Sequence, residues 1–307
     1  MRIRIWPILA FMMYAVPLAF VSMWMGKQAP SWFPVQAAAE SHLIDELFSF
    51  LVMLGSFIFL GVTGVLAYSL LFHRAAADDN SDGPPIEGDV ALEVVWTVIP
   101  VLLVFWIASY SYQIYNQMGI RGSFSTGHSH VPMGMEAAFA DTTTSESAVT
   151  KPTQTIDVIA KQWAWVFRYP YQNVTSTELH LPVNQRVHLA LKSEDVLHGF
   201  YVPAFRLKQD IVPSETIDLE FTPILEGKYS LTDSQFSGTY FAAMNATVVV
   251  ESEEDYQNWL QKAANNMPSP APNQAVSEYA QAAQLPVKNG WITVKPAPAP
   301  VVNFSGY

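Results

Sequence analysis

The sequence predicts a protein with an α-helical membrane part followed by an all-β domain. Three uncharged apolar stretches, at residues 5–25, 47–72 and 94–114, each exceed the roughly 18 residues that indicate a membrane-spanning helix. From residue 155 onward the pattern changes to short runs in which apolar and polar residues alternate, separated by Pro, Gly or Asn. Such runs are typical of strands in an antiparallel sandwich or barrel.

Composition narrows the function classes before any motif is considered. The chain carries a formal net charge of −11, most of it in the β part, which argues against nucleic acid as a partner and suits a cationic protein surface. It has no cysteine, so it forms no disulfide and offers no thiolate to a metal.

The first apolar stretch, within the segment 1–40, is either a cleaved secretory signal or a retained anchor. Arg2 and Arg4 precede it, and the alanine triplet at residues 37–39 offers a small-residue cleavage site. Its apolar span is longer than the core of about 7–15 residues found in secretory signals, which favours retention. In both cases the arginines hold the N-terminus in the cytoplasm.

The next two apolar stretches predict a helical hairpin over residues 41–118, whose polar turn faces the cytoplasm if the first segment is retained. Ser41 can cap the first of these helices, and Asp45 and Glu46 place acidic charge in its first turn. Three glycines near one side of this helix favour close approach of a neighbouring helix: Gly55, Gly61 and Gly64.

Residues 88–100, GDVALEVVWTVIP, open the second helix of the hairpin. A carboxylate at a helix N-terminus and an indole at the membrane interface are both expected on physical grounds. Glu93 and Trp96 therefore require no special function from their positions alone.

Residues 119–154 predict a connecting loop, because they lack any apolar period. Within them, the segment HSHVPMGM gathers copper-compatible side chains: His128, His130, Met133 and Met135. A copper-delivery contact is one interpretation, and the simpler one is that a linker carries such residues by chance.

Residues 155–262 predict the β domain, whose strongest strand signals are the runs IDVIA, VHLAL, TIDLEF, KYSLT and ATVVV. A short acidic-capped helix, SEEDYQNWLQKAA, closes the domain with Tyr256, Trp259 and Leu260 on its apolar side. The Pro- and Ala-rich tail at residues 263–307 either wraps a partner or stays mobile, and composition does not decide between these.

Two segments of the β domain have the form of a ligand loop between strands. VLHGFYVP at residues 196–203 places His198 in an apolar setting, and YSLTDSQFSGTYFAAM at residues 229–244 precedes a final strand. Together they resemble the soluble domain of subunit II of the haem-copper terminal oxidases, in which a histidine before an aromatic-V-P segment precedes a loop of the form C-x3-C-x3-H-x2-M. In that family the loop binds a dinuclear copper centre, and the resemblance implies a cupredoxin-like Greek-key sandwich on the outer face of a membrane.

Laid on that motif, the chain keeps His198 and Met244 and replaces the other copper ligands. Asp233 and Ser237 stand at the two cysteine positions. Gln235 stands at the position of the bridging glutamate, and Phe241 at that of the second histidine. A mixed-valence copper pair needs two bridging thiolates, which neither a carboxylate nor a hydroxyl replaces. We therefore expect no metal at these positions and interpret His198 as a buried, hydrogen-bonded imidazole.

The resemblance implies roles for further residues. In the family, the glutamate matched by Glu93 lies at the cytoplasmic mouth of a proton path into the catalytic subunit. The tryptophan matched by Trp163, in KQWAWVFRYP, serves electron entry from cytochrome c, but without a metal behind it we expect packing to be its role. The segment FRLKQDIVP corresponds to the surface that faces the catalytic subunit, with the charged residues Arg206, Lys208 and Asp210.

The run from residue 78 to residue 118 resembles the cyanobacterial members of the family. Among these, a subunit II without the copper ligands is similar to the alternative respiratory terminal oxidase type, a quinol oxidase. The resemblance therefore implies a structural and proton-entry subunit of a complex that reduces oxygen to water and moves protons. The chain itself would bind no cofactor, because the haems and copper belong to subunit I.

The implied partners are oxidase subunits I and III, quinol as donor to the complex, and membrane lipid. The implied location is a plasma or thylakoid membrane, with the β domain on the periplasmic or lumenal side. Two alternatives stay open: a cytochrome c oxidase subunit 2 that works without the copper relay, and a stand-alone membrane-tethered cupredoxin-like assembly or binding protein. Glu93 and residues 78–118 argue against the lone tether, because an independent anchor does not need that pattern.

Overall fold

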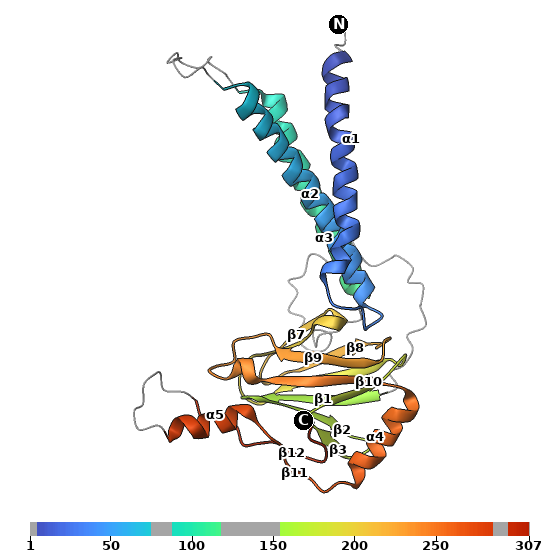
Figure 1. The fold of residues 1–307 in the computed structure, drawn as a ribbon, viewed down its shortest axis with the longest axis vertical. Helices are drawn as coiled ribbons and strands as arrows, with labels where there is room; N and C mark the ends of the chain where they lie inside the picture. Colours follow the sequence, from blue (N-terminus) through green and yellow to red (C-terminus); the bar gives the residue numbers. More distant parts are fainter. Residues whose placement is uncertain (1–4, 75–87, 118–153, 285–293, 307) are drawn as a thin grey trace, which may run out of the picture. The chain divides into compact units, whose positions relative to one another are not determined.

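A computed structural model describes residues 5–74, 88–117, 154–284 and 294–306. The chain divides into two compact units: a helical unit of Met1–Pro34 and His42–Gln117, and a β unit of Val35–Ser41 and Met118–Tyr307. The predicted order of apolar helices followed by a β domain is confirmed (Figure 1).

The helical unit contains α1 (Ile5–Gln28), the 3-10 turn η1 (Ala29–Trp32), α2 (Ser41–Phe72) and α3 (Val90–Gln117). Within the described residues, α2 and most of α3 are long and apolar enough to span a membrane. Many of their large apolar side chains are exposed within the unit. A helix that is apolar all round suits a lipid or protein environment and not water.

α1 and α2 pack closely where a tyrosine meets small residues. The Tyr14 hydroxyl donates to the carbonyl oxygens of Leu60, at 3.0 Å, and Gly61, at 2.7 Å. A Cβ at Gly64 would overlap that hydroxyl, so this glycine permits the approach. The expectation for Gly55 is wrong, since no described atom lies within 4 Å of a Cβ placed there. At about 100° per residue, Gly55 lies on a different side of the helix from Gly61.

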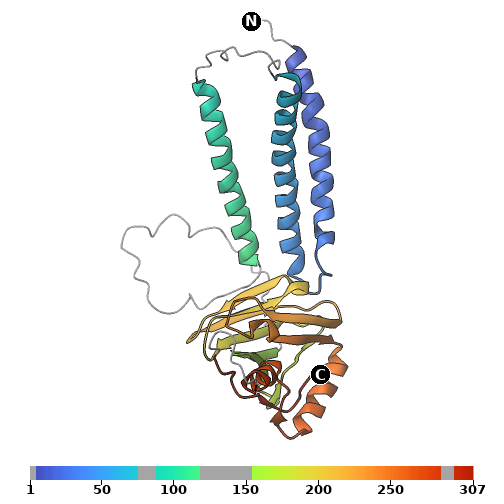
Figure 2. The same ribbon diagram turned by 60° about the vertical axis from the view of Figure 1, so that its left-hand side comes forward.

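α3 packs on α2 through aromatic rings. The centroid of the Phe50 ring lies 5.0 Å from that of Trp106 and 5.6 Å from that of Tyr110, and both contacts are edge-on. Such pairs each add about 0.5–1.5 kcal/mol beyond the buried area. Figure 2 shows α2 and α3 running in opposite directions, as the predicted hairpin requires.

The β unit is a sandwich of two five-stranded sheets with the cupredoxin-like form that the resemblance implies. The first sheet has the order β3 (Val174–Ser176), β2 (Ala164–Tyr169), β1 (Gln154–Lys161), β5 (Val187–Ser193) and β8 (Thr216–Phe221). The second has the order β4 (Leu179–Pro182), β10 (Asn245–Glu251), β9 (Gly227–Asp233), β6 (His198–Val202) and β7 (Leu207–Ile211). All five runs predicted as strands lie in strands.

The sandwich is not purely antiparallel, which corrects the expectation. β1 runs parallel to β5, with Thr155 opposite His188, and β10 runs parallel to β4, with Val248 opposite Leu179. Between the two strands of each pair the chain crosses to the other sheet and returns, which is the kind of connection that parallel neighbours need. Alternation within a strand carries no information about such crossovers.

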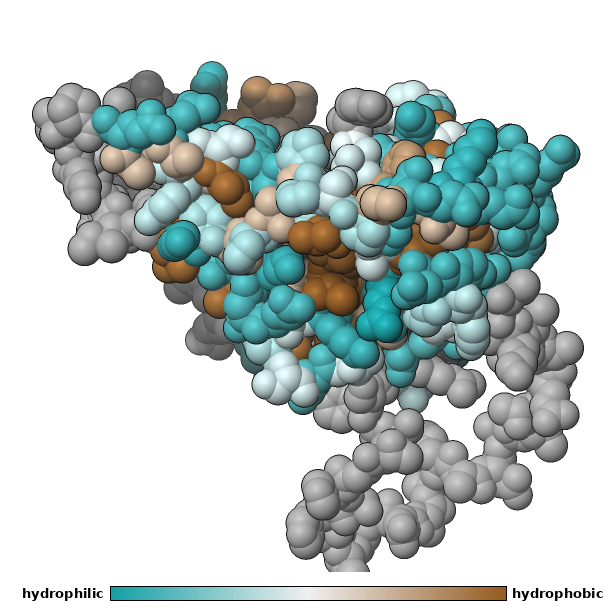
Figure 3. All heavy atoms as spheres, turned by 90° about the horizontal axis from the view of Figure 1, so that it is seen from below, coloured by the Kyte–Doolittle hydropathy of each residue, from teal (hydrophilic) through white to brown (hydrophobic). Residues whose placement is uncertain are grey.

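The sandwich core comes from alternate residues of the strands. On β1, Ile156, Val158 and Ala160 are fully buried, whereas the residues between them are partly exposed. Burying one large apolar side chain in this way contributes about 1.5–3 kcal/mol. One end face of the β unit is, by contrast, covered mostly by hydrophilic side chains (Figure 3).

The link between α1 and α2 belongs to the β unit. The Ala37 amide donates to the carbonyl oxygen of Ala204, at 3.0 Å, and the Ala37 carbonyl accepts from the amide of Ile224, at 2.9 Å. Ala37 and Ala38 are 0% and 1% exposed. Two of the three alanines considered as a cleavage site are therefore interior residues of the β unit.

The helix predicted after the last strand is α4 (Glu253–Asn265). Its N-cap is Ser252, whose hydroxyl accepts from the amide of Asp255, at 3.1 Å. Its predicted apolar side chains are buried: Tyr256, Trp259 and Leu260.

The described parts of the tail pack on this chain. They contain β11 (Ser269–Pro270), α5 (Gln274–Ala283) and β12 (Val301–Val302). The amide of Thr177 donates to the carbonyl of Phe304, at 3.1 Å, and the amide of Asn303 donates to that of Thr175, at 2.9 Å. The tail thereby satisfies the edge of β3, which would otherwise present unpaired backbone groups.

Candidate functional site

Strand pairing brings the two segments of the predicted ligand loop together. β6 begins at His198 and pairs with the end of β9, where Phe200 lies opposite Asp233. The chain then loops through residues 234–244 before β10 begins at Asn245. His198 and the first residues of this loop consequently share one corner of the sandwich.

His198 is fully buried between two carboxylates. Its Nδ1 lies 2.8 Å from Oδ2 of Asp233, and its Nε2 lies 2.9 Å from Oδ1 of Asp195. Burial by itself would lower the pKa of His198, but the hydrogen bonds and charges of the two carboxylates outweigh it and raise the pKa. Both ring nitrogens are therefore engaged, and the ring is stabilised as an imidazolium.

Asp233, at the first cysteine position, organises the loop around it. Its Oδ1 accepts from the amides of Gly199, at 2.7 Å, and Gln235, at 3.1 Å. Its Oδ2 accepts from the hydroxyl of Ser237, at 2.7 Å, in addition to facing His198. Burial alone would raise the pKa of Asp233, yet these hydrogen bonds prevail and lower it.

The other three positions of the motif make protein contacts as well. The Gln235 side-chain amide donates to Oδ1 of Asp210, at 2.8 Å. The Phe241 ring lies edge-on to that of Phe236, with centroids 5.1 Å apart. Met244 is 1% exposed, and its carbonyl accepts from the indole of Trp165, at 3.1 Å.

These side chains do not fit a dinuclear copper centre. Phe241 carries no donor atom, and both nitrogens of His198 already bond to carboxylates. The two bridging positions offer a carboxylate and a hydroxyl, which are hard oxygen donors and not thiolates. In the part of the chain that the structure describes, no group of three or more His, Cys, Asp or Glu side chains is arranged to hold a metal ion.

Trp163 is enclosed beside this loop, with 2% of its surface exposed. Its indole donates to the carbonyl of Ser237, at 3.2 Å, and its ring lies edge-on to Tyr240, at 5.2 Å. From the tail, the side-chain amide of Asn273 donates to the carbonyl of Trp163, at 3.1 Å. These contacts fit the packing role expected of this residue.

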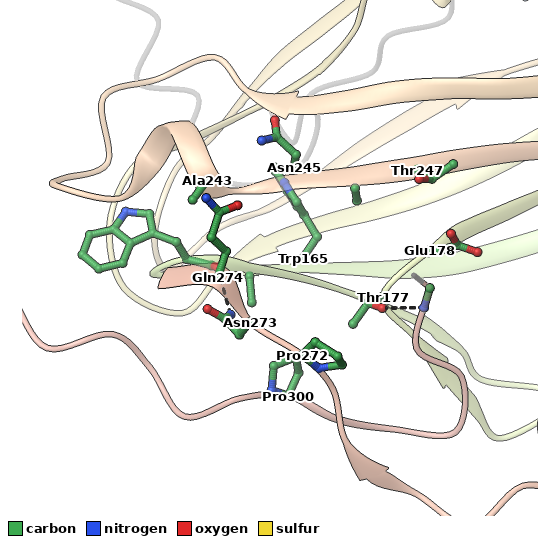
Figure 4. Close-up of a pocket in the computed structure, with 14 residues that line it drawn as sticks. Trp165, Thr177, Glu178, Ala243, Asn245, Thr247, Pro272, Asn273, Gln274 and Pro300 are labelled. Carbon is green, nitrogen blue, oxygen red and sulfur yellow. Dashed lines mark hydrogen bonds between the residues drawn. The ribbon is translucent and has the colours of Figure 1, made fainter. Parts of the chain in front are cut away.

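A cleft of about 310 Å³ separates the tail from the sandwich next to Trp163. Figure 4 shows polar side chains along it, among them Glu178, Asn245 and Gln274. Tail prolines form the opposite wall. The tail thus borders the space beside the indole instead of leaving that face open.

Glu93 lies in the first turn of α3 but does not cap it. The cap is Asp89, whose Oδ1 accepts from the amides of Ala91, at 2.9 Å, and Leu92, at 3.3 Å. Sequence reasoning missed this cap, although an aspartate directly before an apolar run is its usual signal.

The three charged residues of FRLKQDIVP have separate surroundings. Asp210 accepts from Gln235, as described above, and the Arg206 guanidinium donates to the carbonyl of Pro203, at 2.9 Å. Lys208 is exposed on β7. The candidate copper-compatible cluster lies outside the described residues: His128, His130, Met133 and Met135.

Sequence reasoning also missed Asp195, the second carboxylate of His198. It lies three residues before the histidine, in the turn between β5 and β6. An acidic residue this close to a buried histidine was the available signal, but the direction of its side chain depends on the turn, which the residue pattern does not specify.

Two protein domain families match this chain, one in its helical part and one in its β part. Residues 22–114 match the family described as cytochrome c oxidase subunit II, transmembrane domain. Residues 172–252 match the family described as cytochrome c oxidase subunit II, periplasmic domain. The matches cover the helical part and the β part, in that order along the chain.

Relatives with different electron donors in their names are similar to this chain. A cytochrome c oxidase subunit 2 of Synechocystis sp. is 33% identical over 286 residues, which cover 87% of this chain and 85% of that protein. A quinol oxidase subunit 2 of Bacillus subtilis is 28% identical over 234 residues, which cover 76% and 65%. Among solved structures, the periplasmic domain of subunit II of cytochrome oxidase of Bradyrhizobium japonicum is 25% identical, with a TM-score of 0.35, over 37% of this chain and 94% of that domain.

Proposed function

The chain belongs to the cytochrome c oxidase subunit II family, and we propose that it is the subunit II of a haem-copper terminal oxidase that works without a dinuclear copper centre. Such an oxidase reduces oxygen to water and moves protons. In this proposal quinol delivers electrons within the membrane, and the haems and copper of the reaction belong to subunit I. This chain contributes structure, contacts to subunits I and III, and a proton entry.

The observation that carries the proposal is the hydrogen-bonded network at the former ligand positions. Asp233 receives bonds from the amide of Gly199, the amide of Gln235, the hydroxyl of Ser237 and the ring of His198. A buried carboxylate with this many partners is satisfied without a metal. The network therefore supports the proposal that hydrogen bonds within the protein alone fix the conformation of this loop.

The enclosure of Trp163 supports the same proposal. An electron donor that docks from solution needs an exposed contact near the acceptor. Trp163 is 2% exposed, its indole donates to the carbonyl of Ser237, and its backbone carbonyl accepts from Asn273. Tail residues also line the cleft beside Trp163. Delivery of electrons inside the membrane does not need this face.

Glu93 is the residue that we propose for proton entry. Because Asp89 caps α3, the carboxylate of Glu93 is not required for the cap hydrogen bonds. A carboxylate at a helix start can collect protons and pass them to a neighbouring polar channel.

We also propose that α1 is retained as a membrane anchor. Cleavage after the alanine triplet would remove Ala37 and Ala38, which are buried and bonded within the sandwich. The membrane location with an external β domain follows from the family, and we propose a plasma or thylakoid membrane. The arginines before α1 favour a cytoplasmic N-terminus.

Oxygen uptake by the purified complex tests the proposed donor. The complex is supplied with a reduced short-chain quinol or with reduced cytochrome c, at equal haem content. We expect sustained uptake with the quinol and only background uptake with cytochrome c. Uptake with cytochrome c that equals or exceeds uptake with quinol would instead establish the alternative, a cytochrome c oxidase that works without the copper relay.

A further inference from the structure

A second buried histidine lies far along the chain from the loop and has no part in the proposed function. His180, on β4, is 4% exposed. Its Nδ1 lies 3.0 Å from Oε2 of Glu251 on β10, and its Nε2 lies 3.4 Å from Oε2 of Glu178. The ring therefore bridges two carboxylates that come from different strands and turns.

The same ring contacts the two segments that follow the sandwich. It stacks on the indole of Trp259 in α4, with centroids 3.8 Å apart and planes 9° from parallel. On another side, the ring of Phe304 in the tail meets it edge-on at 5.5 Å. His180 is thus a common contact of the sandwich, α4 and the end of the tail.

Glu178 ties the tail to the same place. A Cβ on Gly306 would overlap the Glu178 side chain, so the chain end passes directly against it. The Gly306 amide donates to the hydroxyl of Thr177, at 3.1 Å. A change in the position or charge of Glu178 therefore alters its contact with the last residues of the tail.

The groups that face His180 carry negative charge or none. Glu178 and Glu251 are the carboxylates, Tyr169 bonds to the backbone of His180, and Tyr256 lies next to Tyr169. The Tyr169 hydroxyl is used by the backbone of His180, accepting from its amide at 2.7 Å and donating to its carbonyl at 3.0 Å. Burial raises the pKa of Tyr169 well above its ordinary value and that of Tyr256 likewise, so both stay neutral. Among these groups, only His180 can supply a positive charge.

Protonation decides how well this cluster is satisfied. A doubly protonated ring donates to both carboxylates and presents a cation to the face of Trp259. A neutral ring donates to one carboxylate and turns a lone pair toward the other, while both negative charges remain. Burial would lower the pKa of His180, but the hydrogen bonds to Glu178 and Glu251 prevail and raise it.

We propose that a proton on His180 latches α4 and the tail segment 294–306 onto the sandwich, so that this end of the β domain loosens as the pH of its compartment rises. Opening would also widen the cleft beside Trp163, because Glu178 and Gly306 line both features. The proposal concerns regulation of the outer domain and does not depend on which donor feeds the oxidase.

The direction with pH follows from linkage. A histidine whose pKa is higher in the folded state stabilises that state fully below its ordinary pKa of about 6.5. This contribution is lost as the pH rises through the raised value. Between the two values the equilibrium for opening shifts by up to about tenfold per pH unit.

Hydrogen exchange on the purified complex tests the latch. Amide protection is measured by mass spectrometry between about pH 6 and about pH 9, after correction for the intrinsic pH dependence of exchange. We expect peptides from α4 and residues 294–306 to lose protection as the pH rises, by up to about tenfold per pH unit, relative to peptides from β5 and β8. Equal behaviour of the two sets across this range overturns the proposal.

Two variants locate the effect at His180. In His180→Gln, protection of α4 and the tail should be low at every pH, because no imidazolium forms. In the matched control His188→Gln, which removes the surface pair of His188 with Asp218, the pH dependence should stay that of the parent protein. A parent-like pH dependence in His180→Gln would overturn the proposal, and if that variant does not assemble, the parent titration alone decides.

Discussion

The two buried histidines in the described part of the β unit use the same chemistry for different ends. His198 and His180 each lie between two carboxylates, at 2.8 and 2.9 Å in one case and 3.0 and 3.4 Å in the other. At His198 the main partner, Asp233, is itself fixed by two backbone amides and a hydroxyl. At His180 the partners are the partly exposed carboxylates of Glu178 and Glu251, and the ring stacks on Trp259 of α4.

The difference shows what the surroundings of an imidazolium decide. The His198 cluster holds one loop between β9 and β10, where Asp233 has its partners inside the loop or on β6. The His180 cluster joins separate segments. If its contacts are lost, we expect both α4 and residues 294–306 to be released, whereas loss of the His198 contacts would release one loop. We interpret the first as a fixed cross-link within one loop, and we propose that the second is a contact released by loss of a proton.

Removal of Asp233 should have the largest effect, because it breaks the fixed cluster at its centre. Asp233→Ala leaves a buried imidazolium short of one partner and strands two backbone amides. We expect a loss of about 3–5 kcal/mol in the free energy of unfolding of the β unit. Asp218→Ala is the control, since Asp218 pairs with His188 at the surface and should cost at most about 1 kcal/mol. Similar losses in chemical denaturation of the two variants would remove the distinction between a buried network and a surface pair.

The pH dependence of the His198 loop should differ from that of the His180 latch. The pKa of Asp233 is lowered and that of His198 is raised, so the loop loses stability as pH falls through the first and as pH rises through the second. A tenfold difference in proton affinity between the folded and unfolded states corresponds to about 1.4 kcal/mol of stability. Exchange of the amides of residues 233–237 should therefore be slowest at intermediate pH, after correction for the intrinsic rate. A monotonic dependence would contradict the paired-charge description of this loop.

Glu93→Gln extends the comparison to the helical unit, where a carboxylate is proposed to move protons and not to hold structure. We expect turnover per haem to slow several-fold while the complex assembles normally. Asp89→Ala is the matched control: it removes the α3 cap at a cost of about 0.5–2 kcal/mol in helix stability and should leave turnover per assembled haem unchanged. Equal oxygen uptake by Glu93→Gln and the parent complex at every pH would discard the proton-entry role.

Trp163→Phe should have the smallest effect. The change keeps an aromatic ring in a buried site and removes the indole hydrogen bond to Ser237, so the expected cost is about 1 kcal/mol in unfolding free energy. Turnover with quinol should stay close to that of the parent. A drop of more than an order of magnitude in a normally assembled complex would restore an electron-relay role for this residue.

The sequence predicted what local patterns control. The apolar helices, the five strand runs and α4 each follow from periodicity and a cap within one segment, as Ser252 illustrates. The ligand-loop positions were also predictable, because a motif with fixed spacing carries its residues to one place. That His198 is buried and hydrogen-bonded could be expected once the thiolates were missing.

What could not be predicted depends on contacts between distant segments. The parallel pairs β1 with β5 and β4 with β10 arise from crossovers between sheets. The latch at His180 needs α4 and the tail to meet β4, and nothing in the residues around position 180 signals this. The burial of Ala37 is similar, because its partners Ala204 and Ile224 lie far along the chain from it.

We propose that hydrogen bonds between protein groups occupy the place of the family's copper pair at the loop of Asp233 and Ser237. We would purify the chain, expose it to a mixture of cuprous and cupric ions, remove unbound metal without adding reductant, and measure bound copper together with near-infrared absorption. We expect no stoichiometric copper and no mixed-valence band. Two copper ions per chain with a delocalised mixed-valence signal would contradict it.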